Sequence, residues 1–392
     1  MADRSGRGIG RRTFITAGMV GTTSALLGGK ALAEVVQQYA GTAPAEFPAP
    51  VYRTLGRTGL KVTVVSFGAM LTPEPEVIRV ALEHGVNYVD TARKYMGGNN
   101  EAIVAKAIKG RRDKIFLATK TLPDSRSKVG IIQDVEASLR ALKTDYLDVI
   151  QLHNLTNKQR IFIPETREAL QELKRQGKVR FCGVTTHTGQ AEVLNALVDD
   201  RERFFDTCLV SYNFKTPPEV GQAISRAAKA GIGIIAMKTQ AGGYRTTSLG
   251  KITAHQAALK WVLQNPDVSV AIPGMKDLAQ LRENIAVMGM KFTYADRRRL
   301  ERYAEAVEGF YCTMCGSCEA GCPAGVEIGN VNRALMYAEG GYGDHELARA
   351  TYREIRPGAD AAACLECGSC QAACVNGLDI AAKMERARGL LG

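Results

Sequence analysis

The chain has 392 residues, of which 45% are hydrophobic and 23% charged, and its formal net charge is +11. This length allows one large domain together with a smaller one. The Lys and Arg residues are not interleaved with aromatic residues, which argues against nucleic-acid binding and indicates a basic, soluble surface. No stretch is long and apolar enough to predict a transmembrane helix.

The first 33 residues have the order of a signal peptide. Arg11 and Arg12 precede a short apolar stretch, and a small-residue "ALA" site ends at Ala33. The paired arginines resemble the twin-arginine type of export signal, so we expect residues 1–33 to engage the twin-arginine export machinery and to deliver the protein to the periplasm. A disordered basic head before an amphipathic helix is the alternative. Residues 34–50, which are rich in Pro and Ala, are expected to be a linker.

From residue 51 to residue 310, short β-branched runs alternate with amphipathic helical segments. Continuous apolar strands separated by helices predict a parallel sheet, and eight of them in about 250 residues predict a (β/α)8 TIM barrel. A doubly wound open sheet is the alternative, but no G-x-G-x-x-G motif follows the first strand. The eight predicted strands span residues 62–68, 86–90, 114–120, 146–153, 179–185, 207–213, 231–238 and 268–274.

Polar residues end three successive predicted strands. The second strand ends in Asp90, with Tyr95 five residues later, the third ends in Lys120 and the fourth in His153. Because the active-site face of a barrel lies at the carboxyl ends of its strands, we expect these side chains to converge rather than to be unrelated polar residues on the rim. We expect Lys120 to stabilise the phenolate of Tyr95, Asp90 to fix Lys120, and a neutral His153 to orient a carbonyl oxygen. Together the four residues predict an enzyme that interconverts a carbonyl compound and the corresponding alcohol.

Five segments in this order resemble the aldo-keto reductase family, and the resemblance covers about residues 51–290. It implies that Asp90, Tyr95, Lys120 and His153 form a catalytic tetrad in which Tyr95 is the proton donor. It also implies a small carbonyl or polyol substrate. The segments are "YRTLGRTGLKVTVVSFGAM", "NYVDTARKYMGGNNE", "FLATK", "DVIQLHN" and "IPGMKDLAQLRENI".

The same resemblance implies NADP(H) bound across the barrel mouth without a Rossmann fold, but several residues depart from the family pattern. Thr185 and Thr186 stand where a Ser-Asn pair usually binds the carboxamide. Leu209 stands where a Gln is expected, and Met237 where a Tyr usually stacks on the nicotinamide. The remaining candidates for cofactor binding are Thr185, Thr186, Lys238, Lys276, Arg282 and Asn284. For Lys276 and Arg282, the alternative is that they are solvated charges on a helix.

The chain contains ten cysteines. Cys182 and Cys208 lie within predicted strands and are interpreted as small buried apolar residues. The other eight form two runs with C-x2-C-x2-C-x3-C spacing, which is typical of [4Fe–4S] clusters. Disulfides and zinc sites are the alternatives. The two runs are Cys312, Cys315, Cys318 and Cys322, and Cys364, Cys367, Cys370 and Cys374.

Residues 311–392 are therefore expected to form a small, mainly helical ferredoxin-like domain with two [4Fe–4S] clusters. In ferredoxins the fourth cysteine of each run ligates the other cluster. That precedent assigns Cys374 to the first cluster and Cys322 to the second. Aldo-keto reductase-like proteins with such a tail form a bacterial subgroup, which this chain resembles.

These features predict an exported iron–sulfur oxidoreductase that interconverts a carbonyl and an alcohol, with clusters that relay electrons to or from a redox partner protein. One alternative is an NADPH-dependent carbonyl reductase whose clusters are structural. Another is an electron-transfer protein built on a disused barrel. An intact set of four candidate catalytic residues argues against disuse.

Overall fold

The computed structural model describes residues 47–122, 125–243, 253–340, 342–366, 370 and 372–392. The predicted signal peptide, most of the predicted linker and Cys367 lie outside the described residues. Residues 47–392 belong to one unit of the structure. No helix in the described ranges is both long and apolar enough to cross a bilayer.

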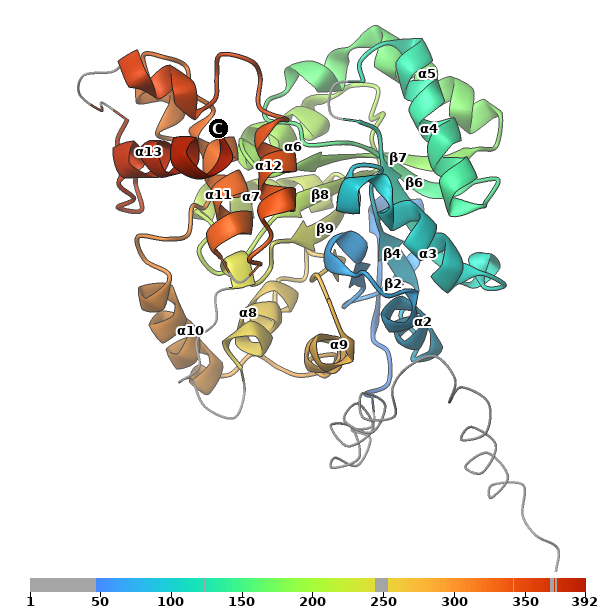
Figure 1. The fold of residues 1–392 in the computed structure, drawn as a ribbon. Helices are drawn as coiled ribbons and strands as arrows, with labels where there is room; N and C mark the ends of the chain where they lie inside the picture. Colours follow the sequence, from blue (N-terminus) through green and yellow to red (C-terminus); the bar gives the residue numbers. More distant parts are fainter. Residues whose placement is uncertain (1–46, 123–124, 244–252, 341, 367–369, 371) are drawn as a thin grey trace, which may run out of the picture. The chain divides into compact units, whose positions relative to one another are not determined.

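The predicted TIM barrel is confirmed in the part of the chain that the structure describes (Figure 1). Eight strands lie side by side in chain order, and each pairs with its neighbour in parallel. Bridges from Val65 to Ala271 and from Gly68 to Gly274 connect the first and last strands. The strands are β3 (Phe67–Gly68), β4 (Tyr88–Asp90), β5 (Phe116–Lys120), β6 (Leu147–Leu152), β7 (Val179–Thr186), β8 (Thr207–Ser211), β9 (Gly233–Met237) and β10 (Val270–Ala271).

The first predicted strand, residues 62–68, is divided between two sheets. Its beginning forms β2 (Lys61–Thr63), which pairs antiparallel with β1 (Tyr52–Thr54), and only its end forms β3. The turn between β1 and β2 contains Gly59 in the left-handed region, with φ of 70°, which favours glycine. Side chains of this hairpin enter the barrel interior and pack there with strand residues; those buried are Leu55, Leu60 and Val62.

Amphipathic helices surround the strands. In α5, for example, Ala169, Leu170 and Leu173 are buried while the charged residues face outward, which is the helical periodicity that the sequence indicates. The barrel helices are α2 (Pro75–Glu83), α3 (Asn100–Ile108), α4 (Lys128–Leu142), α5 (Pro164–Arg175), α6 (Gln190–Asp199), α7 (Pro218–Lys229), α8 (Ala254–Leu263), α9 (Leu278–Ile285) and α10 (Tyr294–Ala306).

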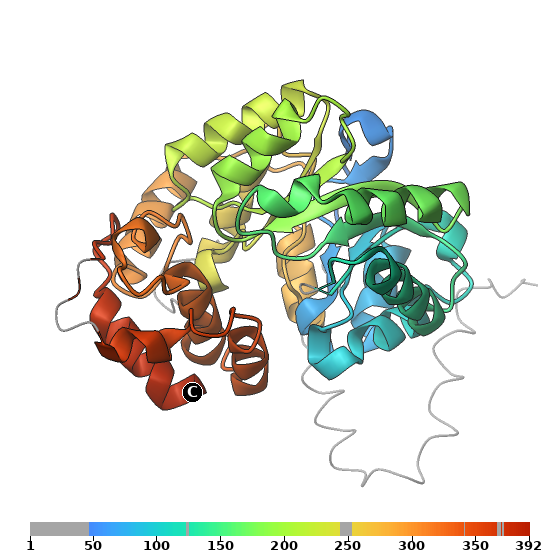
Figure 2. The same ribbon diagram turned by 90° about the horizontal axis from the view of Figure 1, so that it is seen from above.

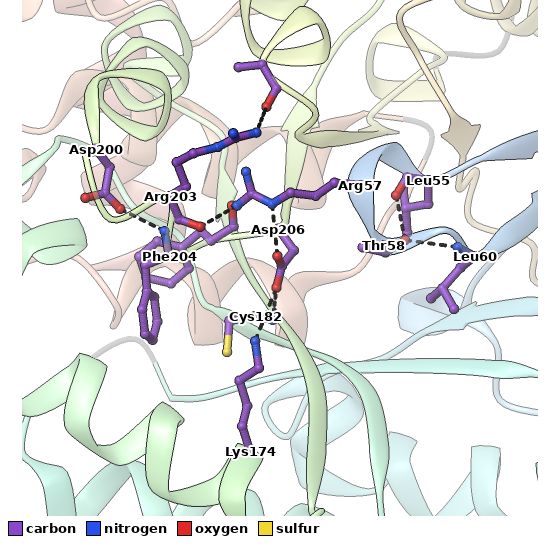
Figure 3. A network of polar contacts seen from close by, with 12 residues as sticks. Leu55, Arg57, Thr58, Leu60, Lys174, Cys182, Asp200, Arg203, Phe204 and Asp206 are labelled. Carbon is purple, nitrogen blue, oxygen red and sulfur yellow. Dashed lines mark hydrogen bonds and ion pairs between the residues drawn. The ribbon is translucent and has the colours of Figure 1, made fainter.

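A network of polar contacts joins the hairpin to the amino-terminal ends of the strands (Figure 3). Nε of Arg57 donates to Oδ1 of Asp206 at 3.1 Å, and the backbone N–H of Cys182 donates to the other carboxylate oxygen at 3.1 Å. Lys174 lies 3.7 Å from that second oxygen. Because Asp206 directly precedes β8, this network fixes the end of the barrel opposite to the carboxyl ends of the strands.

The C-terminal segment, drawn orange to red in Figures 1 and 2, is helical as predicted. Asp344 and Asp379 cap two of its helices by accepting hydrogen bonds from the N–H groups of Leu347 and Ala382. Its apolar side chains form a cluster that also includes residues of α8 and α10, so the segment packs on the barrel. Its helices are α11 (Ile328–Glu339), α12 (His345–Tyr352) and α13 (Ile380–Leu391).

Candidate active site

The four candidate catalytic residues lie at the carboxyl ends of adjacent strands. Asp90 is the last residue of β4, Lys120 is the last residue of β5, and His153 follows β6 directly. Tyr95 begins the short 3-10 helix η3 (Tyr95–Gly98), which follows β4. Since β4, β5 and β6 are neighbours in the sheet, the fold brings these residues to one mouth.

Asp90 and Lys120 form a buried ion pair. Nζ of Lys120 donates to Asp90 and also to the carbonyl oxygen of Thr91 at 2.7 Å. The second oxygen of Asp90 accepts from Nε2 of Gln151 at 2.7 Å. Burial raises the pKa of Asp90 and lowers that of Lys120, and the charge of each partner opposes the shift of the other. The pair therefore fixes the ammonium in place, as the sequence predicts.

Tyr95 lies above this pair, with its ring centroid 4.8 Å from Nζ of Lys120. Burial raises the pKa of the Tyr95 phenol well above its usual value, and the charge of Asp90 raises it further. This result differs from the expectation that Lys120 stabilises the phenolate. The reason is that the ammonium lies over the face of the ring and is already bonded to Asp90 and Thr91. Tyr95 therefore stays protonated in this structure and is a weaker acid than a free phenol.

His153 supplies the neutral imidazole of the site. Its ring centroid lies 6.1 Å from that of Tyr95, and the two rings are nearly perpendicular. His153 is 4% exposed, and burial lowers its pKa well below the usual value, with the nearby charges of Lys120 and Arg333 acting in the same direction. The uncharged ring can donate a hydrogen bond to a carbonyl oxygen without carrying charge into the site.

The candidate nicotinamide residues are mostly bonded to other parts of the chain. The hydroxyl of Thr185 accepts from the N–H of Asn154 at 2.7 Å, and that of Thr186 donates to the carbonyl of Thr188 at 2.8 Å. Oδ1 of Asn284 accepts from Gln240 at 2.8 Å. Arg282 lies in the last turn of α9, partly exposed.

Lys238 and Lys276 contact the C-terminal segment. Nζ of Lys238 donates to the hydroxyl of Tyr337 at 2.6 Å, and its ammonium also lies 5.2 Å from the ring centroid of Tyr342. Nζ of Lys276 donates to the carbonyl oxygen of Tyr342 at 3.1 Å. Two of the six candidate cofactor residues therefore bind a side chain or a backbone carbonyl of the C-terminal segment instead of being free for a cofactor.

A pocket joins the tetrad to the region expected for the nicotinamide. It has about 60 Å³ of free volume, enough for a few water molecules. Tyr342 of the C-terminal segment forms part of its wall. The residues that connect it to the tetrad and to the predicted cofactor region are Asp90, Tyr95, Leu209, Met237, Lys238 and Gly274.

The C-terminal cysteines are arranged in two groups. Cys312 and Cys318 each lie near Cys315 and near Cys374, and burial raises the pKa of Cys312 and that of Cys318 to about 12. N–H groups point at two of these sulfurs, from Met314 to Cys312 at 3.3 Å and from Asn376 to Cys374 at 3.4 Å. Half-buried sulfurs that accept N–H bonds suit [4Fe–4S] ligation.

The second group consists of Cys322, Cys364 and Cys370, which line one small apolar cavity together with Ile328 and Met384. Its fourth candidate, Cys367, lies outside the described residues. This grouping has the crossed pattern that the ferredoxin precedent implies. Among the described cysteines none is in a disulfide, and no three His, Cys, Asp or Glu side chains of the described ranges converge on a single-ion site.

Sequence reasoning missed four residues that reach this mouth. His187 directly follows β7, so its position at a strand end could have predicted that it lies at the mouth of the barrel. Arg333, Tyr337 and Tyr342 belong to the C-terminal segment. Their sequence context is that of an ordinary helix and loop, because their position depends on how that segment packs on the barrel.

The comparisons with known proteins agree with this geometry. The aldo/keto reductase family matches residues 74–251 and 247–305, and a 4Fe-4S dicluster domain matches residues 311–379. The uncharacterized oxidoreductase YqkF of Bacillus subtilis is 28% identical over 64% of this chain and 96% of its own length. Methylglyoxal reductase YeaE of Escherichia coli is 29% identical over 60% of this chain and 86% of its own length.

Among solved structures, an aldo-keto reductase of Klebsiella pneumoniae in complex with NADPH is 26% identical, with a TM-score of 0.55 over 64% of this chain and 95% of that chain. The predicted family resemblance is thus confirmed, and so is the iron–sulfur domain. The chain belongs to the aldo/keto reductase family and is an oxidoreductase acting on carbonyl or alcohol groups, with a 4Fe-4S dicluster domain at its C-terminal end.

Proposed function

We propose that the protein interconverts a small carbonyl compound and its alcohol with Tyr95 as the proton donor, and that its cluster domain is the route by which electrons reach or leave the barrel. Reduction of a carbonyl to an alcohol consumes two electrons and two protons, one proton ending on oxygen and one on carbon. Tyr95, which lines the pocket at the tetrad and carries its phenolic proton, supplies the proton on oxygen. His153 orients that oxygen, while Asp90 and Lys120 hold the base of the site.

The observation that carries the electron route is the contact between the cluster domain and the predicted nicotinamide residues. Tyr337 and Tyr342 bind Lys238 and Lys276, and the pocket beneath them has little free volume. The first turn of α6 also reaches the first cysteine run, because Nε2 of Gln190 donates to the carbonyl of Thr313 at 3.4 Å. When bound, [4Fe–4S] clusters exchange electrons one at a time, and a redox partner protein would be the external donor or acceptor.

A second candidate function is an NADPH-dependent reductase in which the clusters are structural. The NADPH complex of the Klebsiella pneumoniae relative favours it. In this case Tyr337 and Tyr342 would have to leave Lys238 and Lys276 before the cofactor binds. The two candidates therefore differ in the affinity of the resting protein for NADPH.

The first experiment is a titration of NADPH and NADH into the full chain, with its clusters assembled and air excluded. Direct binding is followed by calorimetry. The proposed electron route predicts no saturable binding at cofactor concentrations up to about 1 mM. Micromolar binding would reject the route and support the NADPH-dependent candidate.

A second experiment supplies electrons chemically. Reduced methyl viologen, a one-electron donor, is offered with methylglyoxal as a small carbonyl probe, and alcohol formation is measured. Cys315→Ser is expected to abolish this turnover and to remove cluster signals from electron paramagnetic resonance spectra. Cys182→Ala, a buried strand cysteine outside the runs, is the matched control and should leave both unchanged. Full turnover in Cys315→Ser would contradict the proposal.

We also propose that residues 1–33 direct export by the twin-arginine route to the periplasm. The support is the order of Arg11, Arg12, the apolar stretch and Ala33 in the sequence. Replacement of both arginines by lysine should retain the chain in the cytoplasm of a bacterial host. Unchanged periplasmic recovery of this double variant would contradict export by this route.

A further inference from the structure

A second cavity lies beside the tetrad and is built by both parts of the chain. It has about 30 Å³ of free volume, enough for a water molecule or a small functional group. The barrel provides one wall and helices α11 and α12 of the cluster domain provide the other. The polar and titratable residues in its lining include Lys94, Tyr95, His153, His187, Arg333 and Glu354.

The charges around this cavity do not balance. Arg333 lies 3.3 Å from one oxygen of Glu354, and Lys94 lies 3.8 Å from the other. Both histidines that line the cavity are neutral, since burial lowers the pKa of His153 and that of His187 well below the usual value. Two cations thus face one carboxylate, which leaves the described lining with an excess positive charge.

Two buried nitrogens at the cavity also lack partners. Nε of Arg333 and Nδ1 of His187 have no hydrogen-bond partner among the described residues, although the two residues are only 4% and 5% exposed. An unpaired buried polar group is costly, and such groups in native proteins commonly mark a ligand or water position. Their placement on opposite walls indicates a ligand that bridges the barrel and the cluster domain.

We infer that this cavity binds a carboxylate on the substrate, so that the protein acts on a small hydroxy acid or oxo acid. This inference rests on the proposed function, because Tyr95 and His153 line the cavity and would hold the reacting oxygen next to it. The guanidinium of Arg333 matches a planar carboxylate, and His187 contributes from the side of β7. The cluster domain then completes the substrate site as well as covering it.

The probe for this inference is lactate, compared with its neutral counterpart lactamide, which has the same size but no charge. Binding to the full chain with assembled clusters is measured by calorimetry without air. The wild type should bind lactate more tightly than lactamide. Arg333→Met should weaken lactate binding by about 10- to 100-fold, as expected for the loss of charge-assisted hydrogen bonds, and should leave lactamide unaffected.

A second variant acts in the opposite direction and so separates recognition from loss of folding. Glu354→Gln removes the carboxylate that competes for Arg333 and Lys94, and it should tighten lactate binding by up to about five-fold. The matched control is Arg386→Gln, which removes an exposed ion pair with Glu339 in the same domain and should change nothing. Equal binding of lactate and lactamide, or unchanged lactate binding in Arg333→Met, would overturn the inference.

Carbonyl turnover in Tyr95→Phe tests the proposed function independently of the carboxylate site. If Tyr95→Phe abolishes carbonyl turnover while lactate and lactamide bind alike, the proposed function stands and the carboxylate inference fails. If lactate binding depends on Arg333 but Tyr95→Phe leaves turnover intact, the carboxylate site stands and the assignment of Tyr95 fails.

Discussion

The contacts of Asp206 at the amino-terminal end of the barrel and the candidate site at the carboxyl-terminal end differ in how fully their polar groups are bonded. At the amino-terminal end, both carboxylate oxygens of Asp206 are bonded, to Arg57 and to the N–H of Cys182 (Figure 3). At the carboxyl-terminal end, the Asp90–Lys120 pair is equally well bonded, but the groups above it are not. Nδ1 of His187 and Nε of Arg333 are buried there without partners among the described residues.

This difference distinguishes polar residues that stabilise the barrel from polar residues that are available to bind a substrate. A saturated network stabilises the fold and has no bonding capacity left for a ligand. An unsaturated one lowers stability and is retained where a substrate supplies the missing bonds. Substitutions at the two ends should therefore change different measurements.

The largest expected effect comes from Tyr95→Phe. Loss of the phenol hydroxyl removes the proton donor, so kcat for carbonyl reduction should fall by about 10²- to 10⁴-fold. The thermal unfolding midpoint should change little, because the structure gives this hydroxyl no hydrogen bond to a described residue that its loss would break. Steady-state kinetics and thermal unfolding are measured on the same preparation. A large loss of stability with unchanged kcat would show that Tyr95 is structural.

Asp206→Asn is the counterpart at the other end of the barrel. The amide cannot pair with Arg57 and Lys174 as a carboxylate does, so the free energy of unfolding should fall by about 1–3 kcal/mol. The expected signs are a lower thermal midpoint and an unchanged kcat. A conservative control is Asp206→Glu, which keeps the charge. If Asp206→Asn lowered kcat at constant stability, the two ends would not be separable in this way.

The contact of Tyr342 with Lys238 gives a smaller effect. Tyr342→Ala removes a ring 5.2 Å from the ammonium and part of the wall of the pocket at the predicted nicotinamide position. The affinity of the barrel for NADPH, which the proposed electron route places weaker than about 1 mM in the wild type, should rise by about two- to five-fold, the range of one cation–π contact. Fluorescence titration measures it, with Tyr294→Ala, an exposed tyrosine of α10, as control. Weaker binding in Tyr342→Ala would mean that Tyr342 helps to hold the cofactor.

Much of this site could be predicted from the sequence because it depends on local order. Strand ends in a parallel barrel must meet at one mouth, so the sequence alone is enough to place Asp90, Lys120 and His153 together. The spacing of the cysteines within each run likewise predicts [4Fe–4S] ligation without knowledge of the fold. In both cases the position of a residue follows from its own strand or its own cysteine run, and not from packing between distant segments.

The parts that could not be predicted depend on packing between distant segments. Arg333 reaches the tetrad only because α11 packs on the barrel, and no periodicity in α11 indicates that contact. The pKa of Tyr95 is a similar case. Burial raises it, and the nearby Tyr337 and Glu354 of the C-terminal segment act in the same direction, which the sequence does not indicate.

The smallest expected effect is in the pH dependence, and it follows from His153. The neutral ring is the active form, and burial, together with Lys120 and Arg333, lowers its pKa well below the usual value. A histidine with an ordinary pKa of about 6.5 would be roughly nine-tenths protonated at pH 5.5, so activity would fall about ten-fold between pH 7.5 and pH 5.5. Here kcat should change less than about two-fold over that interval.

The same reasoning predicts how a variant moves the acid limb of the pH profile. Arg333→Met removes one of the cations that disfavour protonation of His153, so the acid limb should shift toward neutral pH, while Arg386→Gln should leave it in place. A conventional ten-fold fall in the wild type would mean that the imidazole is accessible to water and protons. The mouth would then be open in solution, and its unpaired groups would be hydrated rather than reserved for substrate.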